Sequence, residues 1–116
     1  RDLAAQSIIA PLWFDLTTTG ERHQVVAVRQ VTGEDGHPWA QITSAVGYLE
    51  KLDLARCLVL AGEAVTGGVV AEDNLVLFRH SIPLGDTEID GFERPFRLVV
   101  EIADRMEEQL TGADLH

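Results

Sequence analysis

The stretch GGVVAEDNLVLFRHSIPLGDTEIDGFERPFRLVVEIADRMEEQL (Gly67–Leu110) decides the fold, because two different periodicities follow one another in it. The first part places apolar runs on both sides of Asp73-Asn74, a pair that tolerates the positive φ of a tight turn, and predicts a hairpin over Gly67–Ile82. The second part repeats apolar residues every three or four positions, which predicts an amphipathic helix. Its apolar stripe consists of Phe92, Phe96, Val99, Ala103, Met106 and Leu110.

The ends of this helix have their own signals. An acidic connector (Pro83–Gly91) precedes it, and Pro95 is expected near its first turn, where the missing N–H costs nothing. Gly112 is a suitable terminator. The helix is therefore expected to cover one face of a sheet that contains the hairpin.

Upstream, period-two alternation predicts three strands, over Leu12–Leu16, His23–Thr32 and Trp39–Gly47. The turn formers of Gly33–Pro38 join the last two into a hairpin. A helix is expected over Leu49–Gly62, with Asp53 as its N-cap, although Cys57–Leu60 also suits a strand. Its apolar positions are Leu54, Ala55, Leu58 and Val59.

A short helix over Asp2–Ala10, ended by Pro11, completes the series. The predicted fold is α+β, an antiparallel β-sheet flanked by helices in the order α-β-β-β-α-β-β-α. The length suits a single domain over residues 1–116.

The charge limits the kinds of partner. The net charge is −10 with no cluster of Lys or Arg, so phosphate backbones and anionic membrane surfaces would repel the chain. Neither nucleic acid nor a membrane is expected as a partner. Cys57, the single cysteine, excludes an intrachain disulfide, and the apolar runs are too short to span a bilayer, so a cytoplasmic protein is expected.

The sequence contains fragments of metal-binding and catalytic motifs, but none of them is complete. Asp86–Gly91 imitates the start of a calcium-binding loop, but Arg97 stands where a bidentate Glu is required. The histidines lack metal-ligand spacing, and His80 and Ser81 are neighbours on a strand, so they point to opposite faces and cannot act together. We predict no catalytic residue, no metal or cofactor site, and no enzymatic activity.

The strands are apolar on both faces, and this points to binding. A helix layer covers only one face, so either Val26, Val28, Val76 and Phe78 or their alternates Val25, Ala27, Leu75 and Leu77 need another cover. A helix of the same chain, a second subunit or a docked peptide each satisfies this need. The candidate peptide or dimer surface consists of Val26, Val28, Ile42, Val76 and Phe78.

The series of elements, the acidic balance and two stretches carry a family resemblance. These are GGVVAEDNLVLFRHSIPL (Gly67–Leu84) and IADRME (Ile102–Glu107). Over roughly Trp39–Leu110 the chain resembles the YbjN and type III secretion chaperone-like family of bacterial peptide-binding domains. The resemblance implies a homodimer that holds apolar segments of a client protein as a chaperone or adaptor and performs no reaction. The alternative is a regulatory or signalling domain that acts through dimer or partner contacts.

Overall fold

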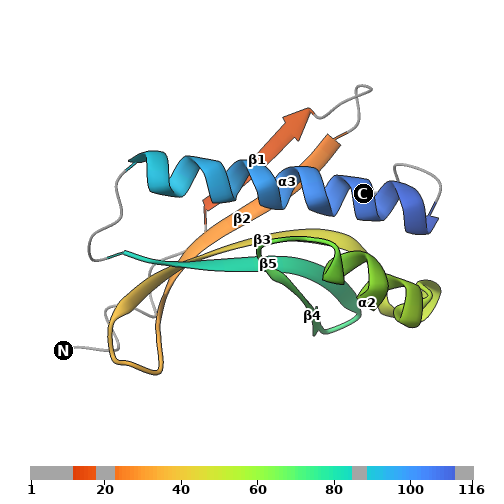
Figure 1. Cartoon of the computed structure of the whole chain (residues 1–116), viewed down its shortest axis with the longest axis horizontal. Helices are drawn as coiled ribbons and strands as arrows, with labels where there is room; N and C mark the ends of the chain where they lie inside the picture. Colours follow the sequence, from red (N-terminus) through yellow and green to blue (C-terminus); the bar gives the residue numbers. More distant parts are fainter. Residues whose placement is uncertain (1–11, 18–22, 85–88, 112–116) are drawn as a thin grey trace.

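The computed structural model describes residues 12–17, 23–84 and 89–111. They form five strands, two α-helices and one short 3-10 helix (Figure 1). In chain order these are β1 (Leu12–Thr17), β2 (His23–Thr32), β3 (Pro38–Tyr48), η2 (Leu49–Lys51), α2 (Leu54–Gly62), β4 (Gly68–Glu72), β5 (Leu75–Pro83) and α3 (Ile89–Thr111). The strands make one antiparallel sheet in the order β1-β2-β3-β5-β4.

The predicted order of elements is wrong at its start. The fold is α+β with an antiparallel sheet, but the first described element is the strand β1, and the order is β-β-β-η-α-β-β-α. The helix expected over Asp2–Ala10 lies outside the described residues. That expectation rested on a segment shorter than the roughly 12 to 15 residues at which helical propensity alone becomes decisive.

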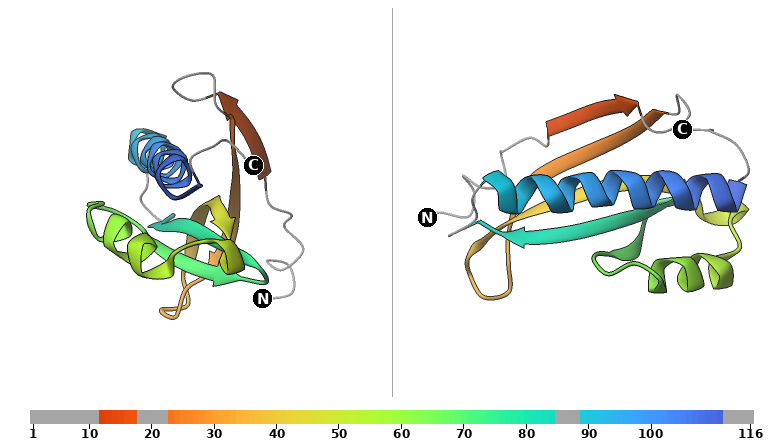
Figure 2. Two further views of the ribbon diagram at one scale, coloured as in Figure 1. Left: turned by 90° about the vertical axis from the view of Figure 1, so that its right-hand side faces the viewer. Right: turned by 45° about the horizontal axis from the view of Figure 1, so that its top comes forward.

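Helix α3 builds the core by covering β2, β3 and β5 (Figure 2). The predicted apolar stripe is confirmed: Val99, Ala103 and Met106 are buried, and the stripe's other members pack beside them. The predicted position of Pro95 is wrong, because α3 already begins at Ile89 and the proline lies inside it. Pro95 therefore leaves the carbonyl of Gly91 without its usual intrahelical donor.

Helix α2 begins where the sequence predicts. The Asp53 side chain accepts a hydrogen bond from the backbone N–H of Arg56 at 3.2 Å, as an N-cap does. The apolar face is reversed, however: Cys57 is buried and Leu60 packs on the core, whereas the predicted positions are exposed. Because this helix has apolar residues on more than one of its sides, their spacing in the sequence could not identify the side that is buried.

The β4–β5 hairpin also follows the prediction. Asp73 takes a φ of 54° in the tight turn, a conformation that Asp adopts more readily than most residues. At the other end, Gly67 has a φ of 79°, and its Cα lies close against the buried ring of Phe78. No helix among the described residues is long and apolar enough to cross a membrane.

Candidate functional site

The five residues chosen from the sequence as a binding surface lie on the side of the sheet that α3 covers. Val26, Ile42 and Phe78 are fully buried, Val76 is 1% exposed, and Val28 packs on the same core. They hold the sheet to the helices and present no surface, so this choice of face is wrong. The sequence alternation defines two sets of side chains, but which set faces the helix depends on tertiary packing.

The alternate set makes the other side of the sheet, which we call the open face. Its apolar residues include Trp13, Val25, Ala27, Ala45, Leu75 and Leu77, and Trp39 lies on the same side. Both described α-helices lie on the opposite side (Figure 2). Trp13 is 67% exposed and Val25 41% exposed, so a substantial part of this apolar surface meets solvent.

A shallow hollow of about 280 Å³ lies in the open face. Ala27, Thr43 and Ala45 provide small side chains on β2 and β3, whereas Trp13 stands on one side and Leu75 on the other. A second hollow of about 510 Å³, lined by Trp39 among others, lies toward the β2–β3 turn. The open face therefore carries both tryptophans of the chain.

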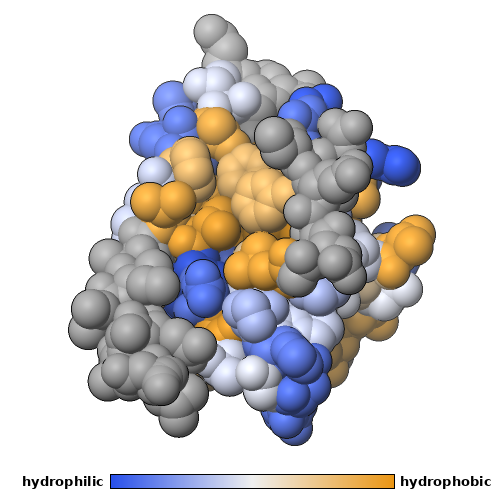
Figure 3. Space-filling model, turned by 90° about the vertical axis from the view of Figure 1, so that its left-hand side faces the viewer, coloured by the Kyte–Doolittle hydropathy of each residue, from blue (hydrophilic) through white to orange (hydrophobic). Residues whose placement is uncertain are grey.

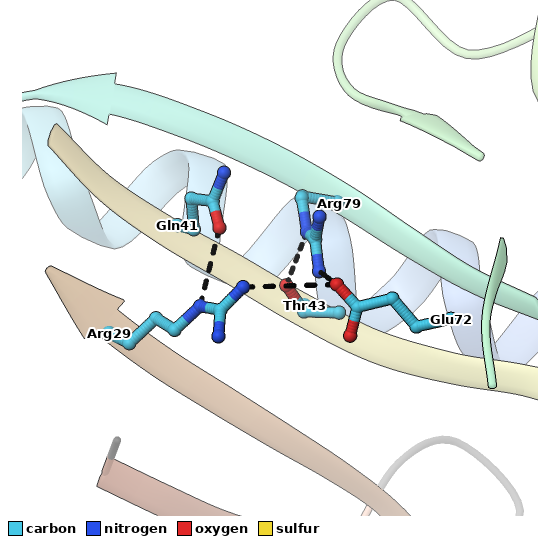
Figure 4. A network of polar contacts seen from close by, with 5 residues as sticks. All are labelled: Arg29, Gln41, Thr43, Glu72 and Arg79. Atoms are coloured by element: carbon cyan, nitrogen blue, oxygen red, sulfur yellow. Dashed lines mark hydrogen bonds and ion pairs between the residues drawn. The ribbon is translucent and has the colours of Figure 1, made fainter. Parts of the chain in front are cut away.

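A polar network crosses the open face beside the first hollow (Figure 4). Arg79 donates from Nη2 to Oε2 of Glu72 at 2.6 Å and from Nε to Oγ1 of Thr43 at 3.1 Å. Arg29 lies 3.8 Å from the same carboxylate and donates from Nε to Oε1 of Gln41 at 3.4 Å. The hydrogen bond and charge of Arg79 lower the pKa of Glu72, so this carboxylate is ionised at neutral pH.

A second apolar surface lies where β1 passes the first turns of α3. We call it the β1–α3 edge and define it by Leu12, Phe14, Phe92 and Phe96. Leu12 and Phe14 are on the helix side of the sheet, yet they are 63% and 39% exposed. The rings of Phe14 and Phe96 meet edge to face with centroids 5.4 Å apart, and Phe92 stacks on Phe96 at 5.8 Å. Figure 3 shows apolar surface gathered on the side of the molecule where α3 begins.

A third apolar surface is the α2 stripe, defined by Leu54, Leu58 and Val59. These side chains are 46%, 63% and 65% exposed. They face away from the core that Cys57 and Leu60 join.

His80, Ser81 and Cys57, the side chains considered for catalysis from the sequence, have surroundings that do not favour it. His80 and Ser81 pair with neighbouring positions of β3, so they point to opposite sides of the sheet, as predicted. The His80 ring lies 2.7 Å from the Thr66 hydroxyl, and partial burial lowers its pKa. Burial raises the pKa of the Cys57 thiol, which disfavours the reactive thiolate. No three His, Cys, Asp or Glu side chains within residues 12–17, 23–84 and 89–111 are placed to hold a metal ion.

Sequence reasoning missed the polar network and the β1–α3 edge. The alternation of β2 does place Arg29 on the same side as Val25 and Ala27, which was a usable signal. The partner Glu72 comes from β4, on the far side of β3 and β5, and only the strand order brings it near. The exposure of Leu12 and Phe14 had no signal, since their alternation indicates burial.

Comparisons with known proteins identify no relative: no family model, no curated protein and no solved structure matches the chain.

Proposed function

We propose that this protein is a non-enzymatic protein-binding domain of the chaperone or adaptor kind, which holds an apolar segment of a client protein on the β1–α3 edge. The resemblance to the YbjN and type III secretion chaperone-like family supports this class of function. So does the surface itself, which offers aromatic and aliphatic side chains and no reactive group.

One observation carries the proposal. Leu12 and Phe14 have the alternation of core residues and lie on the helix side of the sheet, but α3 packs on the strands beyond them and leaves them exposed. Apolar side chains that line up beside a partly exposed aromatic cluster are typical of a surface that a partner covers. A client segment lying along β1 would bury these two side chains and extend the contact to Phe96.

The charge of the domain defines the chemistry of the client further. A net charge of −10 attracts cationic segments and repels anionic ones over distances of about 10 Å at moderate salt. The client segment is therefore an apolar stretch with Lys or Arg on its flanks. We place this binding in the cytoplasm, where a single buried thiol such as Cys57 stays reduced.

The test uses defined peptides and matched variants. An array of overlapping peptides from the source proteome provides binders, and fluorescence anisotropy measures the affinity of the tightest one. Phe14→Ser is expected to weaken binding about tenfold or more, because an aromatic side chain contributes roughly 1.5 to 3 kcal/mol when it is buried. Val65→Ser removes a side chain that is 101% exposed and lies in the loop between α2 and β4, so this control should bind normally.

Two results would contradict the proposal. One is the recovery of no peptide by the folded wild-type protein, which would favour the regulatory alternative. The other is an equal loss of affinity in Phe14→Ser and Val65→Ser, because it would show that binding depends on apolar surface of any kind.

A further inference from the structure

We infer that the open face is the interface with a second copy of this chain, packed face to face across a two-fold axis that runs close to the direction of β3. This interface is separate from the β1–α3 edge, so either proposal can fail without the other.

The size of the open face suits a stable dimer. From the usual rise along strands and the usual spacing between them, the five strands present about 650 Å² of sheet per copy. Specific protein interfaces bury roughly 600 to 1,000 Å² per partner. Face-to-face packing of twisted sheets, with strand directions about 30° apart, is a common solution for such surfaces.

The register of the sheet makes the open face complementary to itself. One row across the strands consists of Trp13, Ala27, Thr43, Arg79 and Gly68, in the order β1-β2-β3-β5-β4. Because β3 is the middle strand, a two-fold axis along it brings β1 of one copy over β4 of the other, and β2 over β5. Trp13 then lies near Gly68 of the second copy and Ala27 near Arg79, while Thr43 meets its own equivalent.

Each bulky side chain in this row thus meets a small one. The Trp13 indole, 67% exposed in the single chain, finds room where Gly68 has no side chain. The neighbouring row repeats the pattern, since Arg29, Gln41 and Ser81 are aligned and the axis brings Arg29 over Ser81. Tryptophan and arginine are among the residues most enriched at the energetic centres of interfaces.

The charges of the open face permit this contact in a very acidic chain. The chain has 19 acidic and 9 basic residues, but Arg29 and Arg79 balance Glu72 and Asp73 around the hollow. Arg79 already has hydrogen-bond partners in Glu72 and Thr43. A second copy therefore buries a group that is paired beforehand, which avoids the penalty of an unpaired buried charge.

Sedimentation equilibrium of the full chain tests the interface. The wild type is expected to be a dimer, and Ala27→Arg should weaken the dimer about tenfold or more, because it places a second guanidinium opposite Arg79. Leu58→Arg adds the same side chain to the exposed α2 stripe and should leave the dimer intact. A monomeric wild type, a dimer that survives Ala27→Arg, or dissociation caused by Leu58→Arg would each overturn the proposal.

A cross-linking experiment tests the axis and does not depend on how well Ala27→Arg folds. Thr43→Cys places a thiol beside its own equivalent, so a short bis-maleimide linker should join two copies efficiently. Val65→Cys, in an exposed loop away from the open face, should give no more product than the parental chain with its buried Cys57. Equal cross-linking of the two variants would overturn the geometry. Peptide binding by two of the variants separates the two proposals. If Phe14→Ser abolishes peptide binding and Ala27→Arg does not, the client site is on the β1–α3 edge and is independent of the dimer interface.

Discussion

At the scale of the residue, Gly67 combines a left-handed backbone with close contact to a buried ring. Its φ of 79° is unfavourable for any residue with a Cβ, and a Cβ built there would lie 2.6 Å from Cε2 of Phe78. The Phe78 ring is fully buried, so it cannot swing out into solvent to make room. We expect Gly67→Ala to lower the free energy of unfolding by about 2 to 4 kcal/mol, which combines backbone strain with overpacking.

Urea denaturation at neutral pH provides the measurement, and Gly36 provides the control. Gly36 has a φ of 82°, but nothing lies within 4 Å of a Cβ placed on it. Gly36→Ala should therefore cost only the backbone term, about 1 kcal/mol. If the two variants lose the same stability, the contact with Phe78 is not the constraint.

At the scale of the element, His80 on β5 fastens the loop between α2 and β4 through Thr66. Because burial lowers its pKa, the folded chain binds a proton at His80 less readily than the unfolded chain does. The contribution of neutral His80 to stability is fully present above the pKa of the unfolded chain, near 6.5. It is lost as the pH falls through the lower pKa of the folded chain. Stability should thus decrease from pH 7.5 to pH 5.5.

The comparison of variants isolates this contribution. Urea denaturation of His80→Gln is expected to show a shallower dependence on pH across that window than the wild type. The carboxylates whose pKa is lowered, Asp35 and Glu72, lose their contribution only at more acidic pH. An unchanged slope in His80→Gln would show that the histidine does not control the packing of this loop.

Also at this scale, the buried side could be predicted from the sequence for elements with apolar residues on one side. It could not be predicted for elements with apolar residues on several sides. The stripe of α3 and the cap at Asp53 specify their own geometry locally, and both predictions are confirmed. Strand β2 and helix α2 are apolar on more than one side, so the neighbours that select their buried side decide the result. The prediction that the five residues form a binding surface was wrong for this reason. The open face could be found only from the strand order, which depends on contacts between distant parts of the chain.

At the scale of the whole molecule, the strand order separates two apolar surfaces. The β1–α3 edge lies on the helix side, whereas the open face lies on the other side of the same sheet. A sheet with helices on both sides would have lost the second surface. The proposed client binding and the proposed pairing of two copies would therefore use different residues of one small domain.

The net charge of −10 gives these two surfaces opposite responses to salt. Two copies that each carry a net charge of −10 repel one another, so screening should tighten the dimer as NaCl rises from about 50 mM to about 500 mM. The same screening removes the attraction for a basic client peptide, whose affinity for the β1–α3 edge should fall. Sedimentation equilibrium and fluorescence anisotropy over one salt series measure both effects. A dimer that weakens with salt would show that ion pairs between copies, rather than the fit of Trp13 and its row, hold the interface together.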